Sequence, residues 1–164
     1  MKTIVGLVVP ADMEEPVTEL RFVSDDALNA MQKVVGGYVD VVDTALPETT
    51  VWLNDEGMIK YLEPNPRATM FIWAGAPRRR GGQAYYGDVL ITGQPDEEGN
   101  TTSLPDELLD LILRTDEYKI EVQTGGDSWA GNGKRFADYW IALHYVLELA
   151  ERWVLVTNVR VVAS

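Results

Sequence analysis

The stretch VTELRFVSDDALNAMQKVVGGYVDVV, residues 17–42, changes its hydrophobic period twice. Residues 17–23 alternate apolar and charged side chains, which is typical of a half-buried strand. Ser24 then stands where a helix N-cap is expected, and apolar residues recur at helical spacing until Gly36 stops the helix. Residues 38–42 return to a strand pattern. A strand, a helix and a second strand are therefore predicted here.

The rest of the chain continues this mixture of strands and helices. Further strands are predicted at residues 4–9, 50–53, 58–62, 87–93, 118–123 and 153–162, with those at 50–53 and 58–62 forming a hairpin around the turn at 54–57. Ser103 is expected to cap a second helix that ends near Arg114, and a third, amphipathic helix contains the apolar positions from Phe136 to Ala150. Residues 68–73 are apolar but too few to assign by periodicity. This order predicts an α+β fold, one mostly antiparallel or mixed sheet with about three helices.

The composition of the chain narrows its possible chemistry. Its 164 residues suit one domain with a sizeable core, and its formal charge of −12 argues against general nucleic-acid binding, which needs a cationic face. Cysteine is absent and His144 is the only histidine, so thiolate chemistry is excluded and zinc binding is disfavoured. We expect no metal, no cofactor and no catalytic residues. No apolar run approaches the length of a membrane span, so we expect no membrane contact and a cytoplasmic location.

Four segments of the chain occur in the order found in a known family. They are residues 31–40 (MQKVVGGYVD), 54–57 (NDEG), 62–69 (LEPNPRAT) and 87–93 (GDVLITG). With them, residues 3–115 resemble the uncharacterised family called domain of unknown function 3846. The resemblance implies a setting in bacteriophages and in conjugative elements of bacteria, and it supplies no catalytic or binding residue.

Local structure accounts for these four segments without a functional site. A glycine after a helix gives it a left-handed exit, residues 54–57 form a turn, and glycines at 87 and 93 bracket a tightly packed strand. The resemblance divides the chain into a family-like core, residues 1–115, and a strand–helix–strand extension, residues 116–164. We expect both to pack into one domain. A protein-specific activity would lie in the extension or in the insertion at residues 78–83.

The Gly-rich loop at residues 125–135 is the first candidate binding segment. It lies between a predicted strand and a predicted helix, but Ser128 and Arg135 stand where a Walker loop needs Gly and Ser or Thr. Lys134 and Arg135 at the helix start would still attract an anion weakly. Trp129, if exposed, would anchor a protein interface.

The same loop does not fit a serine hydrolase, because the chain offers no suitable histidine as the general base. Ser128 would have to act with His144, which instead stands one helical turn from Glu148 and is expected to form an ordinary surface pair with it.

A second candidate is the cationic run Arg78, Arg79 and Arg80. It concentrates three of the fourteen cations in one Gly-flanked loop of an acidic chain. Such a loop would contact an acidic partner or a nucleic-acid backbone, although charge runs are more often solvated surface.

These observations favour a binding protein over an enzyme. The leading hypothesis is a non-enzymatic phage or mobile-element accessory protein that binds a host bacterial protein, for host takeover or counter-defence. The first alternative is an acidic DNA mimic that blocks a restriction or other defence enzyme, which requires carboxylates in rows with phosphate-like spacing. The second is a nucleotide or small-anion binding protein, or an enzyme, that uses the loop at 125–135.

Overall fold

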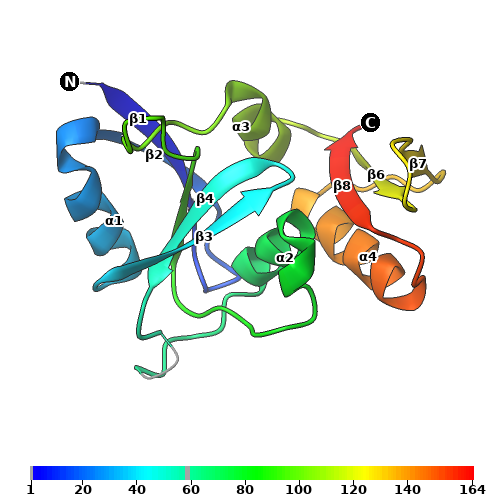
Figure 1. Ribbon diagram of the computed structural model, residues 1–164, viewed down its shortest axis with the longest axis horizontal. Helices are drawn as coiled ribbons and strands as arrows, with labels where there is room; N and C mark the ends of the chain where they lie inside the picture. Colours follow the sequence, from blue (N-terminus) through cyan, green and yellow to red (C-terminus); the bar gives the residue numbers. More distant parts are fainter. Residues whose placement is uncertain (1, 58–59) are drawn as a thin grey trace.

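Two antiparallel sheets make up the strands of the protein (Figure 1). The computed structural model describes residues 2–57 and 60–164. The first sheet has the order β2-β1-β5-β4-β3, from β1 (Thr3–Val9), β2 (Thr18–Val23), β3 (Val39–Ala45), β4 (Glu48–Asn54) and β5 (Val89–Thr92). The second has the order β7-β6-β8, from β6 (Tyr118–Gln123), β7 (Ala130–Gly131) and β8 (Asn158–Ala163).

Helices lie on both sides of the first sheet and between the two sheets (Figure 1). They are α1 (Ala27–Val35), α2 (Pro66–Gly75), α3 (Asp106–Leu113) and α4 (Tyr139–Arg152), with 3₁₀ turns η1 (Ser24–Asp26) and η2 (Pro77–Arg79). The α+β class is confirmed. The strands form two sheets rather than one, however, and the described residues contain four α-helices rather than about three.

β5 is the central strand of the first sheet, and all four of its residues are buried. Leu90 packs in one apolar cluster with Met31 of α1, whereas Val89 and Ile91 pack in another with Phe71 of α2. A strand covered on both faces needs a continuous apolar run rather than an alternating one. The short buried strand predicted between the glycines at 87 and 93 is therefore confirmed.

β4 forms its hairpin with β3, the strand that precedes it. The chain turns at Leu46-Pro47 between these two strands. The other edge of β4 is paired with β5, so no edge remains for a strand that follows it. The predicted hairpin is wrong for this reason. Residues 58 and 59 of that segment lie outside the described residues, and residues 60–61 form a turn.

Two serines expected to cap helices bind the backbone of the first strand region instead. The Ser24 hydroxyl oxygen accepts the backbone N–H of Lys2 at 3.2 Å, and the Ser103 hydroxyl oxygen accepts that of Val5 at 2.8 Å. Both cap predictions are wrong because these long-range bonds replace the local ones. The predicted left-handed exit of α1 at Gly36 is confirmed, with φ at 78°.

Residues 68–73, unassigned from the sequence, lie in α2, and the helix begins at a polar junction built on Asn65. The fully buried Asn65 side chain accepts the N–H of Ala68 at 3.0 Å, as a helix N-cap. Its Nδ2 donates to the carbonyl oxygens of Val9 and Gly87, each at 2.9 Å. One side chain thus joins the end of β1, the approach to β5 and the start of α2.

The second sheet packs its inner face on α4. Alternate residues of β6 are buried, and an apolar cluster that contains Ile91 and Phe71 also contains Leu143 of α4 and Val161 of β8. The core of the chain therefore spans both sheets. The last strand begins only at Asn158: residues 153–157, predicted as its first part, contain a turn at 154–155 and no strand.

Replacing Asn65 by Ala is expected to destabilise the protein by about 3 kcal/mol, since it removes a helix cap and leaves two buried carbonyl groups unpaired. The free energy of unfolding from urea denaturation measures this loss. Asn29→Ala is the matched control, because the exposed Asn29 amide bonds only the Asp26 carboxylate, at 3.3 Å. Equal stability of the two variants would contradict the role given to Asn65.

Candidate functional site

The four family-like segments contact one another inside the first half of the fold. Besides the Asn65 junction, the buried Asn54 amide donates to the carbonyl of Val35 at the end of α1, at 3.1 Å, and its Oδ1 accepts the N–H of Glu56 at 2.8 Å. A side chain at Gly93 would collide with the loop at Thr102. These residues pack against and hydrogen-bond to other parts of the chain. A functional site is therefore expected outside the four segments.

The three arginines after α2 have three different environments. Arg80 is partly buried and its Nε donates to the carbonyl of Trp73 at 3.2 Å, and desolvation lowers the pKa of its guanidinium. Arg79 donates to the Tyr85 hydroxyl at 3.3 Å. Arg78 is exposed, with no hydrogen bond or ion pair to any described residue. The run is therefore not one uniform cationic surface.

Trp129 in the Gly-rich loop is half-buried beneath a cation. The Arg160 guanidinium carbon of β8 lies 4.0 Å from the centre of the indole ring. The same guanidinium is held by Glu121 of β6, with Nε and Nη2 at 2.8 and 2.6 Å from one carboxylate oxygen. Trp129 is thus stacked on the outer face of the second sheet rather than fully exposed.

Lys134 and Arg135 lie ahead of the start of α4, and both contact neighbouring groups of the chain. The Lys134 ammonium lies 5.2 Å from the centre of the Tyr145 ring, and Arg135 donates to the carbonyls of Asn132 and Lys134. The helix begins later, and the Asp138 carboxylate already accepts the first free N–H groups, those of residues 140 and 141. No hydrogen bond or ion pair within the described residues joins this loop to the arginines after α2.

The expected surface pair of His144 and Glu148 is confirmed, with Nδ1 and Oε1 3.0 Å apart. Within residues 2–57 and 60–164, no three His, Cys, Asp or Glu side chains are grouped as a metal site requires. In the same ranges, no helix has the length and apolar character to cross a membrane.

An exposed apolar turn follows α4 where the sequence predicted the start of a strand. Trp153, Val154 and Leu155 are 41%, 92% and 63% exposed. The segment that contains them is held at its end, where the backbone N–H of Thr157 donates to the carbonyl of Gln123 at 2.8 Å. Sequence reasoning missed this surface because β-branched and aromatic residues in a row are typical of a strand.

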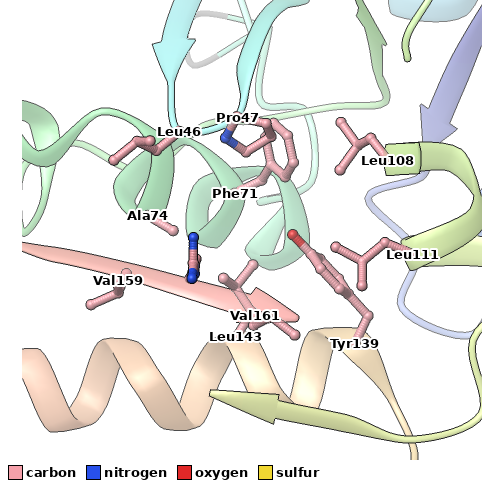
Figure 2. A pocket seen from close by; sticks show the side chains of 11 residues that line it. Leu46, Pro47, Phe71, Ala74, Leu108, Leu111, Tyr139, Leu143, Val159 and Val161 are labelled. Atoms are coloured by element: carbon pink, nitrogen blue, oxygen red, sulfur yellow. The ribbon is translucent and has the colours of Figure 1, made fainter. Parts of the chain in front are cut away.

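A cavity of about 240 Å³ lies between α2, α3, α4, β8 and the turn that joins β3 to β4 (Figure 2). Its lining is almost wholly apolar and consists of Leu46, Pro47, Phe71, Ala74, Leu108, Leu111, Tyr139, Leu143, Val159, Arg160 and Val161. The Tyr139 hydroxyl points from α4 into the space between the labelled side chains (Figure 2). Tyr139 precedes Leu143 by four residues, so helical spacing alone would have placed it on the buried face.

Tyr139 and its neighbour Tyr118 differ in the hydrogen bonding of their hydroxyl groups. The Tyr118 hydroxyl donates to the carbonyl of Leu111 at 2.6 Å. The Tyr139 side chain is only 6% exposed, and its hydroxyl has no hydrogen bond to any described residue. Desolvation is the main cause that raises the pKa of Tyr139 well above its usual range, so this hydroxyl keeps its proton and is a donor.

Comparison with protein-family models matches residues 1–117 to the family described as domain of unknown function DUF3846. The chain belongs to this family. No curated protein and no solved structure matches the chain. The DUF3846 segment contains the first sheet, α1, α2 and α3, and therefore the four segments that the sequence resemblance rested on.

The cavity lies where the DUF3846 segment meets the rest of the chain. Phe71, Ala74, Leu108 and Leu111 on its wall belong to the matched residues, whereas the lining of α4 and β8 lies beyond residue 117. Within this DUF3846 protein, neither part forms the cavity alone.

Removing the hydroxyl groups of the two tyrosines is expected to have opposite effects. Tyr118→Phe should destabilise the DUF3846 protein by about 1 kcal/mol, because a buried carbonyl loses its donor, whereas Tyr139→Phe should leave stability unchanged or raise it. Urea denaturation of both variants measures the difference. An equal loss in both would mean that the Tyr139 hydroxyl is bonded within the protein.

The stacking of Arg160 on Trp129 is expected to contribute about 0.5–1 kcal/mol of coupling free energy, the range of a partly exposed cation–π contact. A double-mutant cycle of Trp129→Ala and Arg160→Met measures it from unfolding free energies. Trp129→Ala combined with Lys119→Met on β6 provides the control pair. Additive effects in the first cycle would show that the stacking does not hold the Gly-rich loop.

Proposed function

We propose that this DUF3846 protein is a non-enzymatic accessory protein of a phage or mobile element that acts by binding a host bacterial protein. The exposed apolar turn, Trp153 to Leu155, carries the proposal. Three consecutive apolar side chains in water are unfavourable, and such runs on a protein surface usually mark an interaction site. A protein that covers the turn would bury this apolar surface.

The Gly-rich loop extends the proposed surface. Its first residues are tied to the end of the turn, since the backbone N–H of Gly125 donates to the Thr157 hydroxyl oxygen at 3.2 Å, and Thr157 in turn bonds Gln123. The turn and the loop therefore share one end of the second sheet. Trp129, fixed by its stacking on Arg160, would contribute a rigid aromatic edge to the interface at little entropic cost.

The charges near the turn indicate the partner's chemistry. Glu151 and Arg152 directly precede the turn and are exposed, and the loop segment contains exposed Asp127 as well as exposed Lys134 and Arg135, so the polar surroundings of the turn carry both signs of charge. A partner with an apolar pocket for Val154 and Leu155 and a rim of mixed charge would complement this surface.

The acidic DNA mimic has less support. Several carboxylates are placed by local backbone turns: Asp96 accepts the N–H groups of Asn100 and Glu98, each at 2.9 Å, and these bonds lower its pKa. Asp88 accepts the N–H of Ala11 at 2.9 Å. Acidic side chains that serve turns and caps follow the backbone and not the spacing of phosphates.

Replacing Leu155 by Asp is expected to abolish capture of the partner, because it puts a charge into the apolar contact. The measurement is affinity purification of the tagged chain from a bacterial lysate at low salt. Leu28→Asp is the matched control, since Leu28 on α1 is 58% exposed and receives the same change. The proposal expects one stoichiometric protein that Leu28→Asp retains and Leu155→Asp loses.

Two results would contradict this function. One is the absence of any stoichiometric partner. The other is a partner that Leu155→Asp and Leu28→Asp retain equally, which would place the interface elsewhere on the chain. With the partner purified, the Kd for Leu155→Asp should be at least about tenfold higher than for the unmodified chain, the usual cost of losing an interface anchor.

A further inference from the structure

The cavity lined by Phe71, Leu108, Tyr139, Leu143 and Val161 has the composition of a small-molecule site. Ligand pockets are mainly apolar and contain a few polar groups that fix the orientation of the ligand. This cavity has apolar walls from five elements of the fold, and the Tyr139 hydroxyl points into it (Figure 2). It also lies between two parts of the chain, as ligand sites often do.

The Tyr139 hydroxyl is the group that distinguishes this cavity from a packing defect. The Tyr139 hydroxyl oxygen is not among the fully buried, unpaired polar atoms of the described residues, so it reaches the open space of the cavity. There it donates to water or to a ligand that displaces the water. In the same region, the hydroxyl of the neighbouring Tyr118 has an acceptor within the protein, the carbonyl oxygen of Leu111. Tyr139 has no such acceptor among the described residues, and its donor is available to whatever occupies the cavity.

We infer that the cavity binds a neutral, mostly apolar small molecule with one hydrogen-bond acceptor, which accepts the proton of the Tyr139 hydroxyl. The ligand is neutral because the cationic side chain on the lining, Arg160, is already paired with Glu121 and stacked on Trp129. An anion in this apolar space would have no free positive charge to balance it.

A ring of benzene size with one short polar substituent matches the space. Protein cavities lined by Leu and Phe bind benzene itself, so an apolar ring needs no further contacts. The ligand would enter beside Leu46, which is 37% exposed, and Leu111, which is partly exposed. Because most of the walls come from buried side chains of α2, α3, α4 and β8, a free small molecule suits the space better than a loop of another protein.

Acetophenone and α-methylstyrene test the inference. The two compounds have nearly the same shape, and only acetophenone carries an acceptor, its carbonyl oxygen. Isothermal titration of the full chain should show acetophenone binding about fivefold more tightly than α-methylstyrene, the difference that one hydrogen bond makes. The preference should disappear in Tyr139→Phe and persist in Tyr118→Phe, whose hydroxyl is already bonded within the protein.

A second pair of variants locates the binding. Leu111→Trp places a larger side chain on the cavity wall and should reduce the affinity for both compounds by at least about tenfold, whereas Leu113→Trp, on the same helix but outside the lining, should leave it unchanged. Failure of acetophenone to bind at millimolar concentration would overturn the inference. So would a preference for acetophenone that survives in Tyr139→Phe. Neither readout involves the protein partner, so this test and that of the proposed function fail independently.

Discussion

The buried amide of Asn65 is the contact on which the first half of the fold depends. Its side chain accepts a backbone N–H of α2 and donates to two carbonyl groups, one at the end of β1 and one just before β5. The central strand, its neighbour and the helix that covers them are therefore fixed to one another at a single point. Because an amide offers donors and an acceptor together, no apolar residue of the same size can take its place. The neighbouring Arg67 continues the junction by donating to three carbonyls of the loop between β1 and β2.

Local patterns in the sequence predict the elements of this fold better than their pairing. The helix after Val23 and its glycine exit, the buried strand at β5 and the strand at β6 follow from hydrophobic period and from glycine position. The hairpin partner of β4 does not, because strand pairing depends on which edges other strands have already taken. The predictions that Ser24 and Ser103 cap helices are wrong for a similar reason, since each hydroxyl bonds a backbone group that is distant along the chain.

In the candidate site, too, the sequence indicates local features but not those that depend on tertiary structure. Trp129, Lys134 and Arg135 are prominent in the sequence by residue type, and each is engaged with a neighbour in the structure. The exposed turn and the cavity were not predicted, because both arise from tertiary arrangement. The sequence of an apolar run does not show whether the run is exposed. Nor does a tyrosine on the buried face of a helix show that its hydroxyl has no acceptor among the residues that the structure describes.

The position of the cavity, between the DUF3846 segment and the rest of the chain, ties the shape of the cavity to the core of the fold. The DUF3846 segment holds its own strands and helices together through its buried amides, so it acts as a scaffold with one open apolar side. The C-terminal segment supplies the opposite wall, including the tyrosine hydroxyl. Leu143 and Val161 on that wall also belong to the apolar core that both parts share, so a substitution there would change the shape of the space and the stability of the fold together. Variation of the cavity is thereby limited to side chains that the core can accommodate.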